Sequence, residues 1–279
     1  MAHFSPKRSR KKDIQSPKSH HRSILNKDQF VWGIHSVLEA LKACPHCVKE
    51  IFVEKSKKGL RLEELLEMAQ QNSVSVTFGT STIEATYKKY SGPLEQGSSQ
   101  GVSARIILPV LTLDELLGKL KNISKPPLLL ALDSIQDPHN LGAIIRSAVA
   151  AGVNGLILPK DRSASITGTV IKVSAGAVFH LDICSVTNLV SSFKVLKDEG
   201  IWIFGTAKDS SQAVYETDLT LPACLVIGSE GKGLRPLVAE HCDIYISIPM
   251  QGSLDSLNAS VAAGIILFET VRQRKAKYK

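Results

Sequence analysis

The chain has 279 residues and a formal net charge of +8 at pH 7. This length allows two domains and a sizeable buried core. Its longest apolar run, residues 261–268, is far shorter than the roughly 20 residues that cross a bilayer, so no membrane segment is expected. Residues 1–28 contain no apolar stretch, which argues against a secretory signal.

The positive charge is concentrated near the two ends of the chain. Residues 1–28 contain eight Lys or Arg and two Asp, and residues 272–279 contain five Lys or Arg and no acid. Two basic tails favour salt-sensitive attraction to nucleic acid phosphates, although a role in solubility alone explains them equally well. The composition of residues 1–28, which is rich in Ser, Pro and Lys, predicts that this segment is disordered. An organelle import signal is the alternative.

The five cysteines are odd in number and lack the spacing of a disulfide framework. This favours a reducing compartment, and we expect the cytoplasm. Cys44 and Cys47 have the CxxC spacing of a redox or zinc pair. Because no second CxxC completes a tetrahedral zinc site, we favour a structural turn there. Cys184, Cys224 and Cys242 lie in apolar, strand-like segments that are typical of a core.

Residues 29–106 form the first predicted folded unit, a small α/β domain. The apolar spacing predicts a helix after Gly33, a strand at 49–53, a helix at 60–70, and strands at 74–78 and 102–108. Glycines and a proline between residues 92 and 101 indicate loops. Residues 107–127 follow as a linker that contains a short helix at 113–120.

Residues 128–279 form the second predicted domain. Apolar runs predict strands at residues 128–132, 155–158, 178–183, 201–204, 223–227 and 244–248, with helices between them and after the last. Strands that alternate with helices predict a parallel sheet covered on both faces. The expected fold class is therefore α/β.

The first polar cluster of this domain, residues 133–148, follows a predicted strand and opens a helix. Asn140 is a candidate N-cap for that helix. Arg146 lies off the apolar stripe of the helix and should project away from the sheet. Taken alone it is a solvated surface arginine. Its position near the carboxyl end of a strand favours a ligand site, because ligands of open α/β sheets bind there.

Two further clusters follow later strands. Residues 228–233 form a Gly-rich loop that contains Glu230 but matches neither a Walker loop nor a GxGxxG motif. Because the acid would repel phosphate, a small organic or cationic ligand fits this loop better than a nucleoside triphosphate. The third cluster contains Ser256 and Asn258, each of which, taken singly, is best explained as a cap of the final helix. That helix is nearly all apolar, so we expect it to be buried around most of its girth.

Together these clusters resemble, in their order along the chain, the signature motifs of the SpoU (TrmH-like) family of RNA ribose 2′-O-methyltransferases. The resemblance is carried by Asn140, Arg146, Gly228, Glu230, Pro249, Ser256 and Asn258, and by residues 172–177 between the first two motifs. It implies that residues 128–279 form an α/β-knot (SPOUT) domain, in which the C-terminal segment threads through a loop. It also implies a homodimer through this domain, with each active site near the partner.

The family resemblance further implies the cofactor S-adenosylmethionine and the residues around it. The residues expected to bind the cofactor are Gly205, Thr206, Gly228, Ile248, Met250 and Leu257. The residues expected to serve catalysis are Arg146, Asn140, Glu230, Ser256 and Asn258. The family arginine is often assigned as the base. Since arginine is effectively never deprotonated in proteins, we expect Arg146 instead to clamp the phosphate beside the reacting ribose. No metal is expected.

The small domain resembles the substrate-binding domain of the family members that modify ribosomal RNA. The similarity lies in residues 33–41 and 100–104, with Ser99 at a position where the family usually has His. The expected substrate is therefore a guanosine of large-subunit ribosomal RNA. A tRNA 2′-O-methyltransferase and a non-catalytic RNA-binding assembly factor are the alternatives. A dinucleotide-dependent enzyme fits the strand and helix pattern alone, but no GxGxxG follows the first strand.

Overall fold

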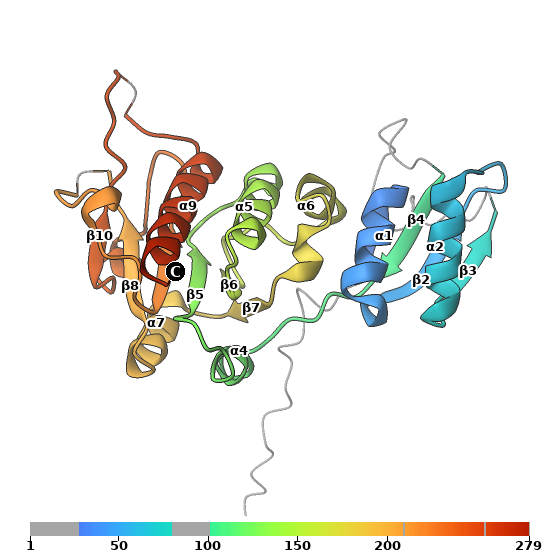
Figure 1. The fold of residues 1–279 in the computed structure, drawn as a ribbon. Coiled ribbons are helices and arrows are strands. Elements are labelled where there is room, and N and C mark those ends of the chain that lie inside the picture. The colour runs from blue at the N-terminus through green and yellow to red at the C-terminus, as the bar shows by residue number, and fades with distance from the viewer. Residues whose placement is uncertain (1–27, 80–100, 209, 254, 279) are drawn as a thin grey trace, which may run out of the picture.

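The computed structural model describes residues 28–79, 101–208, 210–253 and 255–278. These residues form two α/β units joined by a connecting segment (Figure 1). The expected basic tail before residue 28 and the predicted loop residues between 80 and 100, including Ser99, lie outside the described residues. No helix within the described ranges is long and apolar enough to cross a membrane.

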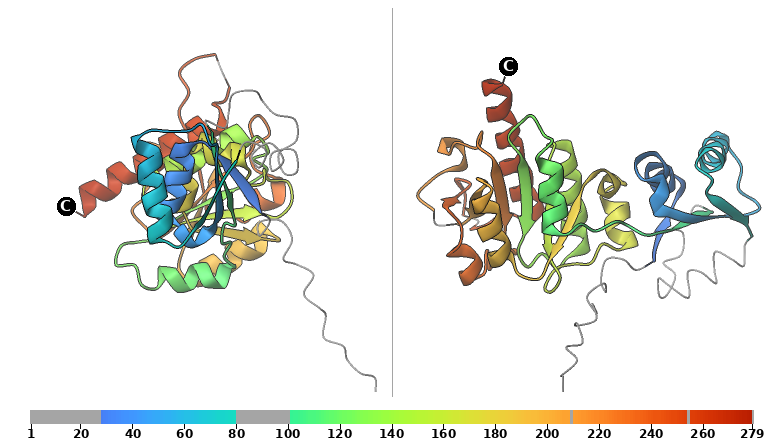
Figure 2. Two further views of the ribbon diagram at one scale, coloured as in Figure 1. Left: turned by 90° about the vertical axis from the view of Figure 1, so that its right-hand side faces the viewer. Right: turned by 90° about the horizontal axis from the view of Figure 1, so that it is seen from below.

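The small unit is a four-stranded sheet with two helices on one face (Figure 2). Its strands are β1 (Gln29–Trp32), β2 (Val48–Val53), β3 (Ser75–Phe78) and β4 (Val102–Ile106), and its helices are α1 (Ile34–Ala43) and α2 (Leu60–Gln71). The strand order is β1-β4-β2-β3, and only the pair β2 and β3 is parallel. The predicted helices and strands of this unit are confirmed. The four residues of β1 are additional, because so short a run shows no clear period.

The large unit is a six-stranded sheet in the order β10-β8-β9-β5-β6-β7, in which every neighbouring pair is parallel. The strands are β5 (Leu128–Leu132), β6 (Gly155–Pro159), β7 (Ile183–Val186), β8 (Trp202–Thr206), β9 (Ala223–Ile227) and β10 (Ile244–Ile246). The helices are α4 (Leu113–Leu120), α5 (Pro138–Ala150), α6 (Gly168–Val173), α7 (Leu189–Asp198), α8 (Pro236–Ala239) and α9 (Ala259–Lys277). The predicted parallel α/β architecture is confirmed.

Alternating side chains of the central strand β5 divide the core into two layers. Leu128, Leu130 and Leu132 pack in the layer of α5, α6 and α9, whereas Leu129 and Ala131 pack in the layer of α4, α7 and α8. Successive side chains of a strand point to opposite faces, so a strand covered on both faces is apolar throughout. Helices accordingly lie on both sides of the sheet (Figure 2).

The strand predicted at residues 178–183 was wrong. Residues Ala177–His180 form a short 3-10 helix, η2, and the strand runs from Ile183 to Val186. Gly176, at φ 82°, turns the chain into η2. Val178 and Phe179 are buried because η2 packs against α5 and against α1 of the small unit. This packing needs apolar residues, and the resulting apolar run cannot be distinguished from a strand by its sequence pattern.

The connecting segment is attached to the large sheet. The backbone N–H of Leu111 donates to the carbonyl of Ile183 at 2.8 Å, and the N–H of Ser185 donates back to Leu111 at 3.2 Å. Directly afterwards, Thr112 caps α4 in a reciprocal capping box with Glu115. The predicted helix at 113–120 is confirmed, and it packs its buried Leu116 under the sheet.

The two units are also packed directly on each other. A Cβ atom at Gly168, at the start of α6, would lie 2.6 Å from the carbonyl oxygen of Phe30 in β1. A Cβ atom at Gly176 would lie 2.6 Å from the Cβ of Glu39 in α1. One layer of core side chains is continuous across both units. The small unit is therefore held against α6 and η2.

The basic residues between positions 272 and 277 belong to the final helix, which the sequence predicted. They lie on the last turns of α9, which the structure describes to residue 278. The guanidinium of Arg274 donates to the backbone carbonyls of Pro126, at 2.6 Å, and Leu221, at 2.7 Å. Longer bonds reach Pro127 and Leu219. Arg274 is thus bound to the entry segments of β5 and β9 and is not available for RNA phosphates.

Candidate active site

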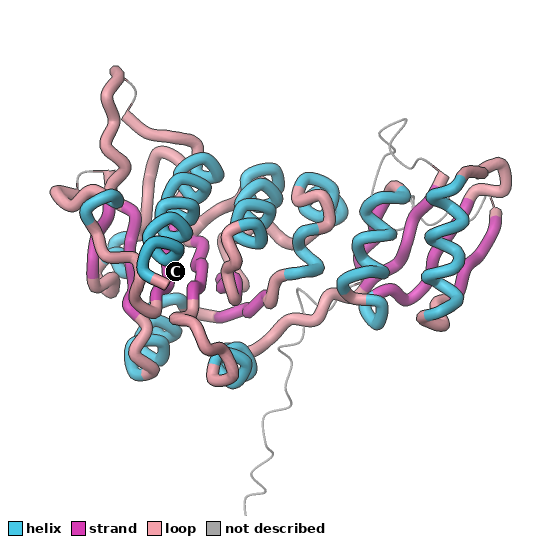
Figure 3. Tube along the Cα trace, in the orientation of Figure 1, coloured by secondary structure: helices cyan, strands magenta, loops and turns pink. Residues whose placement is uncertain are grey.

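Three loops that follow β5, β9 and β10 bring the predicted site together. Because the six strands are parallel, their carboxyl ends lie at one edge of the sheet. Between β10 and α9, the described residues 247–253 and 255–258 form neither helix nor strand (Figure 3). This segment leaves the edge strand β10 and returns to the central strands, as expected for the threaded C-terminus of an α/β-knot.

Asn258 joins all three loops. It is the N-cap of α9, and its Oδ1 accepts hydrogen bonds from the backbone N–H of Ser260, at 2.9 Å, and from the Ser260 hydroxyl, at 2.6 Å. Its Nδ2 donates to Oδ1 of Asn140 at 2.9 Å and to Oε2 of Glu230 at 3.3 Å. The capping role anticipated for Asn258 is therefore confirmed, and the other end of the same amide links Asn140 to Glu230.

The capping role predicted for Asn140 was wrong. Asp137 is the N-cap of α5, where its carboxylate accepts from the N–H of His139 at 2.8 Å, and Pro138 follows at the first helical position. Asn140 lies within the first turn of α5. Its side chain is consequently free of the helix end and bonds Asn258.

The loop that carries Glu230 is a tight hairpin. Ser229 and Gly233 exchange backbone hydrogen bonds at 3.0 and 2.9 Å. A Cβ atom at Gly228 would lie 2.3 Å from the carbonyl carbon of Gly233, so only glycine allows the chain to close on itself there. The hairpin leaves the Glu230 side chain exposed above the sheet, next to Asn258.

A pocket of about 160 Å³ lies beside the Asn258 amide. Five of the six residues predicted to bind a cofactor line it: Thr206, Gly228, Ile248, Met250 and Leu257. The sixth, Gly205, lies one residue below in β8, where a Cβ atom would lie 2.6 Å from Sγ of Cys242. Glu230 and Ser256 also line the pocket, and Ile227, Ile246 and Ile266 close its floor. Apolar walls, a carboxylate and exposed backbone suit an aromatic ring joined to a cationic group.

Arg146 lies six positions after Asn140 on the same helix and is exposed, as its place off the apolar stripe predicted. Within the described residues, its guanidinium makes no hydrogen bond or ion pair, and it does not line the pocket. Arg146 thus remains available to a group outside this chain. Ser256 is likewise exposed, and among the described residues it does not cap α9.

The sequence did not predict two ion pairs that lie around the site. The fully buried Asp133, directly after β5, binds Arg235, which follows the Gly-rich loop. Lys208 and Asp255, both at the rim of the pocket, approach to 3.2 Å. Asp133 stood in the first polar cluster without an assigned partner. Nothing in the local sequence around Arg235 or Lys208 indicates these long-range pairs.

Comparison with known proteins agrees with this geometry. The SpoU rRNA Methylase family matches residues 127–268, and the domain described as RNA 2′-O ribose methyltransferase substrate binding matches residues 30–83. The chain belongs to the SpoU rRNA methylase family. The first match covers the sheet and all three loops of the site, and the second covers most of the small unit.

The similarity to individual SpoU proteins extends over nearly the whole chain. The 23S rRNA (guanosine-2′-O-)-methyltransferase RlmB of Pseudomonas putida is 42% identical over 251 residues, which are 88% of this chain and 97% of that protein. RlmB of Escherichia coli is 41% identical over 88% of this chain and 99% of its own length. The SpoU methyltransferase AviRb of Streptomyces viridochromogenes, solved with the cofactor AdoMet, superposes with a TM-score of 0.74 at 26% identity, covering 89% of this chain and 91% of that one.

Proposed function

We propose that this SpoU methyltransferase transfers the methyl group of S-adenosylmethionine to the ribose 2′-hydroxyl of a guanosine in 23S rRNA. The names of its full-length relatives support the substrate. The main support for the proposal is the Asn258 amide, which joins Asn140 to Glu230. This contact lies beside a pocket whose lining suits S-adenosylmethionine. The matched substrate-binding unit supports ribosomal RNA over tRNA.

The pocket residues fit S-adenosylmethionine by their chemistry. When bound, this cofactor supplies an electrophilic methyl group on a positively charged sulfur. Ile248, Met250 and Leu257 offer apolar contact for its adenine, and Gly228 also lines the pocket. The carboxylate of Glu230 favours a cation at this edge of the pocket.

Arg146 binds the RNA in this proposal. Its guanidinium is permanently charged and exposed, so it can clamp the phosphate next to the reacting ribose in a bidentate manner. Positive charge beside the ribose lowers the pKa of the 2′-hydroxyl, and the clamped phosphate accepts the departing proton. Asn140 and Asn258 orient the ribose, and Glu230 and Ser256 complete the site by hydrogen bonding.

We also propose that the enzyme is a homodimer through its large unit. The sequence predicted that α9 is buried around most of its girth, and this was wrong. Val261 and Phe268, two turns apart on this helix, are 49% and 50% exposed. A second copy that covers this face would bring its own α5 and Arg146 near the first pocket. We expect the dimer to act in the cytoplasm, with import into an organelle as the alternative.

The test compares Arg146→Ala with Lys194→Ala, a control at an exposed cation on α7, which covers the opposite face of the sheet. Arg146→Ala should lower methyl transfer to 23S rRNA by about 100-fold or more and leave the Kd for S-adenosylmethionine within about twofold. The control should keep both. Normal methylation by Arg146→Ala would overturn the proposed mechanism. Methyl transfer only to tRNA, or none by the parent protein, would overturn the proposed function.

A further inference from the structure

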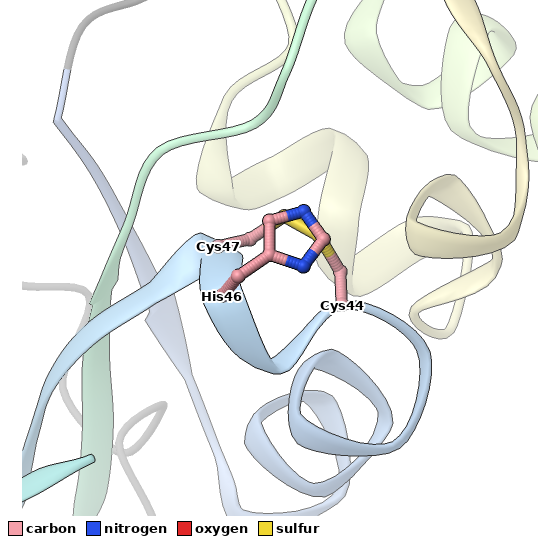
Figure 4. A group of neighbouring side chains, drawn as sticks. All are labelled: Cys44, His46 and Cys47. Atoms are coloured by element: carbon pink, nitrogen blue, oxygen red, sulfur yellow. A yellow bond between two sulfur atoms is a disulfide. The ribbon is translucent and has the colours of Figure 1, made fainter. Parts of the chain in front are cut away.

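Cys44, His46 and Cys47 form a compact cluster outside the methyltransferase site. Cys44 ends α1, and Pro45–Cys47 form the 3-10 helix η1 that leads into β2. The turn brings the two Cα atoms to 5.3 Å, within the range that a disulfide spans, and the sulfurs are bonded. The ring of His46 lies over them (Figure 4), with Nε2 3.4 Å from Sγ of Cys44.

The other cysteines are unsuited to thiol chemistry. Burial raises the pKa of Cys184 and of Cys242 to about 12, and raises that of Cys224 still further. A thiol must lose its proton to become a nucleophile, so these three are inert at neutral pH. In the described part of the chain, the Cys44 and Cys47 pair is therefore the better candidate for thiol chemistry.

The two sulfurs differ in access. Both cysteines are buried, Cys44 at 6% and Cys47 at 1% exposure, but Cys44 and His46 line a cavity of about 610 Å³, whereas Cys47 does not. The opposite wall of this cavity comes from η2 and the connecting segment, including Pro109 and His180. The carbonyl of Cys47 accepts from the N–H of Ile107, at the start of the connecting segment, at 2.9 Å. The pair thus lies at the joint between the two units.

We propose that Cys44 and Cys47 are a reversible thiol–disulfide exchange site for small disulfides of the glutathione class. In the reduced pair, the Cys44 thiolate attacks the small disulfide, forms a mixed disulfide and releases one small thiol. The Cys47 thiolate then attacks Sγ of Cys44, closes the intramolecular bond and releases the second thiol. The net reaction converts the dithiol and one small disulfide into a protein disulfide and two small thiols.

His46 assists the attacking thiol. Cys44 lies at the carboxyl end of α1, where the helix dipole disfavours a thiolate. The exposed imidazole beside Sγ of Cys44 offers a hydrogen bond or a positive charge that offsets this effect. The cavity gives a small disulfide a path to Cys44 and none to Cys47.

A soft metal ion is the competing occupant of this cluster. The ligand atoms of Cys44, His46 and Cys47 all lie within 4.8 Å of one another. Among the residues that the structure describes, however, no fourth His, Cys, Asp or Glu joins this group. Structural zinc sites are almost always four-coordinate, so the three groups favour exchange chemistry over a metal.

The full-length protein tests this proposal in buffers of reduced and oxidised glutathione, with acid quenching, thiol alkylation and intact mass spectrometry. The parent should pass between dithiol and disulfide in one two-electron transition confined to Cys44 and Cys47. Cys47→Ser should accumulate glutathione on Cys44, whereas Cys44→Ser should trap none on Cys47. His46→Ala should slow the exchange roughly three- to tenfold at pH 7. The control Cys242→Ser should leave the transition unchanged.

Three results would overturn the proposal. One is a parent protein that stays a dithiol at every glutathione ratio, a measurement that does not depend on the folding of any variant. Another is equal trapping of glutathione by the two serine variants. The third is one equivalent of Zn²⁺ bound to the reduced parent, lost in Cys47→Ser, that blocks oxidation by glutathione disulfide. That outcome would assign the cluster to a metal.

Discussion

Asp133 and Arg235 form a two-point contact between residues that are 102 positions apart. Oδ1 of Asp133 accepts from Nε of Arg235 at 2.6 Å, and Oδ2 accepts from the backbone N–H of the same residue at 2.8 Å. The Asp133 side chain is fully buried, whereas that of Arg235 is 35% exposed. The pair fixes the carboxyl-terminal end of the Gly-rich loop to the end of β5, so it sets where Glu230 stands.

Arg235→Ala should destabilise the protein more than an average surface substitution. It leaves the buried carboxylate of Asp133 with two neutral donors, the backbone N–H of residue 235 and the Ser134 hydroxyl, but without its cation. Breaking a buried ion pair costs about 3 kcal/mol or more. Urea unfolding measures the loss. Lys232→Ala, at an exposed residue of the same loop, is the control and should change stability by no more than about 0.5 kcal/mol. Equal stability of the two variants would show that the ion pair between Asp133 and Arg235 does not stabilise the fold.

Substitutions of Asn258 should separate capping from the bridge between Asn140 and Glu230. Asn258→Asp keeps an oxygen acceptor for the N–H of Ser260 but removes both donors and sets a second carboxylate near Glu230. Its stability should stay within about 0.5 kcal/mol of the parent, whereas Asn258→Ala loses about 1 kcal/mol with the cap. Methyl transfer should fall at least about tenfold in both. An active Asn258→Asp enzyme would show that the bridge is dispensable.

The buried Cys184 thiol should make the protein less stable at alkaline pH. Burial raises its pKa from 9.0 to about 12. Below pH 9 the thiol is neutral in both states, but between pH 9 and 12 only the unfolded chain loses the proton, so unfolding becomes easier as pH rises. Between pH 8 and 10 the parent should lose about 1 kcal/mol more than Cys184→Ala, measured by urea unfolding. Parallel pH profiles would contradict this account.

The exposed face of α9 should carry the proposed dimer. Phe268→Glu places a charge at the centre of that face, and burying a charge without a partner is costly, so the protein should become monomeric at micromolar concentration. Sedimentation equilibrium measures the mass. Val195→Glu, at a partly exposed apolar residue of α7 on the other side of the sheet, should leave the mass unchanged. A monomeric parent protein would contradict the dimer itself.

The spacing of apolar residues was sufficient to predict helices and strands that bury a regular face against the sheet or its helices. The helix at Leu113–Leu120 and the strands at Leu128–Leu132 and Ala223–Ile227 have the predicted bounds. The pattern failed at Ala177–His180, where the apolar side chains are buried by another unit of the fold. The contacts of Arg274 in the final helix could not be predicted either, because the carbonyls that hold it belong to segments far away in the sequence.

The same distinction applies to the candidate site. Motif order identified Asn140, Glu230 and Asn258, which the structure brings into contact, and the pocket residues, of which all but Gly205 line one cavity. The bond network could not be predicted, because Asn258 offers both a cap acceptor and two donors, and their partners depend on the tertiary fold. Arg146 lies on the expected, exposed side of its helix, but the sequence pattern alone does not distinguish a ligand-binding arginine from a solvated one.

The position of Asn258 and Arg274 on the final helix has a consequence for biosynthesis. The helix α9 is translated after the six strands of the large sheet, so a growing chain can form these strands while the amide that joins Asn140 to Glu230 is still missing. The contact between the three segments therefore cannot form until the chain has been translated past Asn258. A stop codon before Arg274 would also remove its hydrogen bonds to the carbonyls of Pro126 and Leu221, leaving the start of two central strands unsecured.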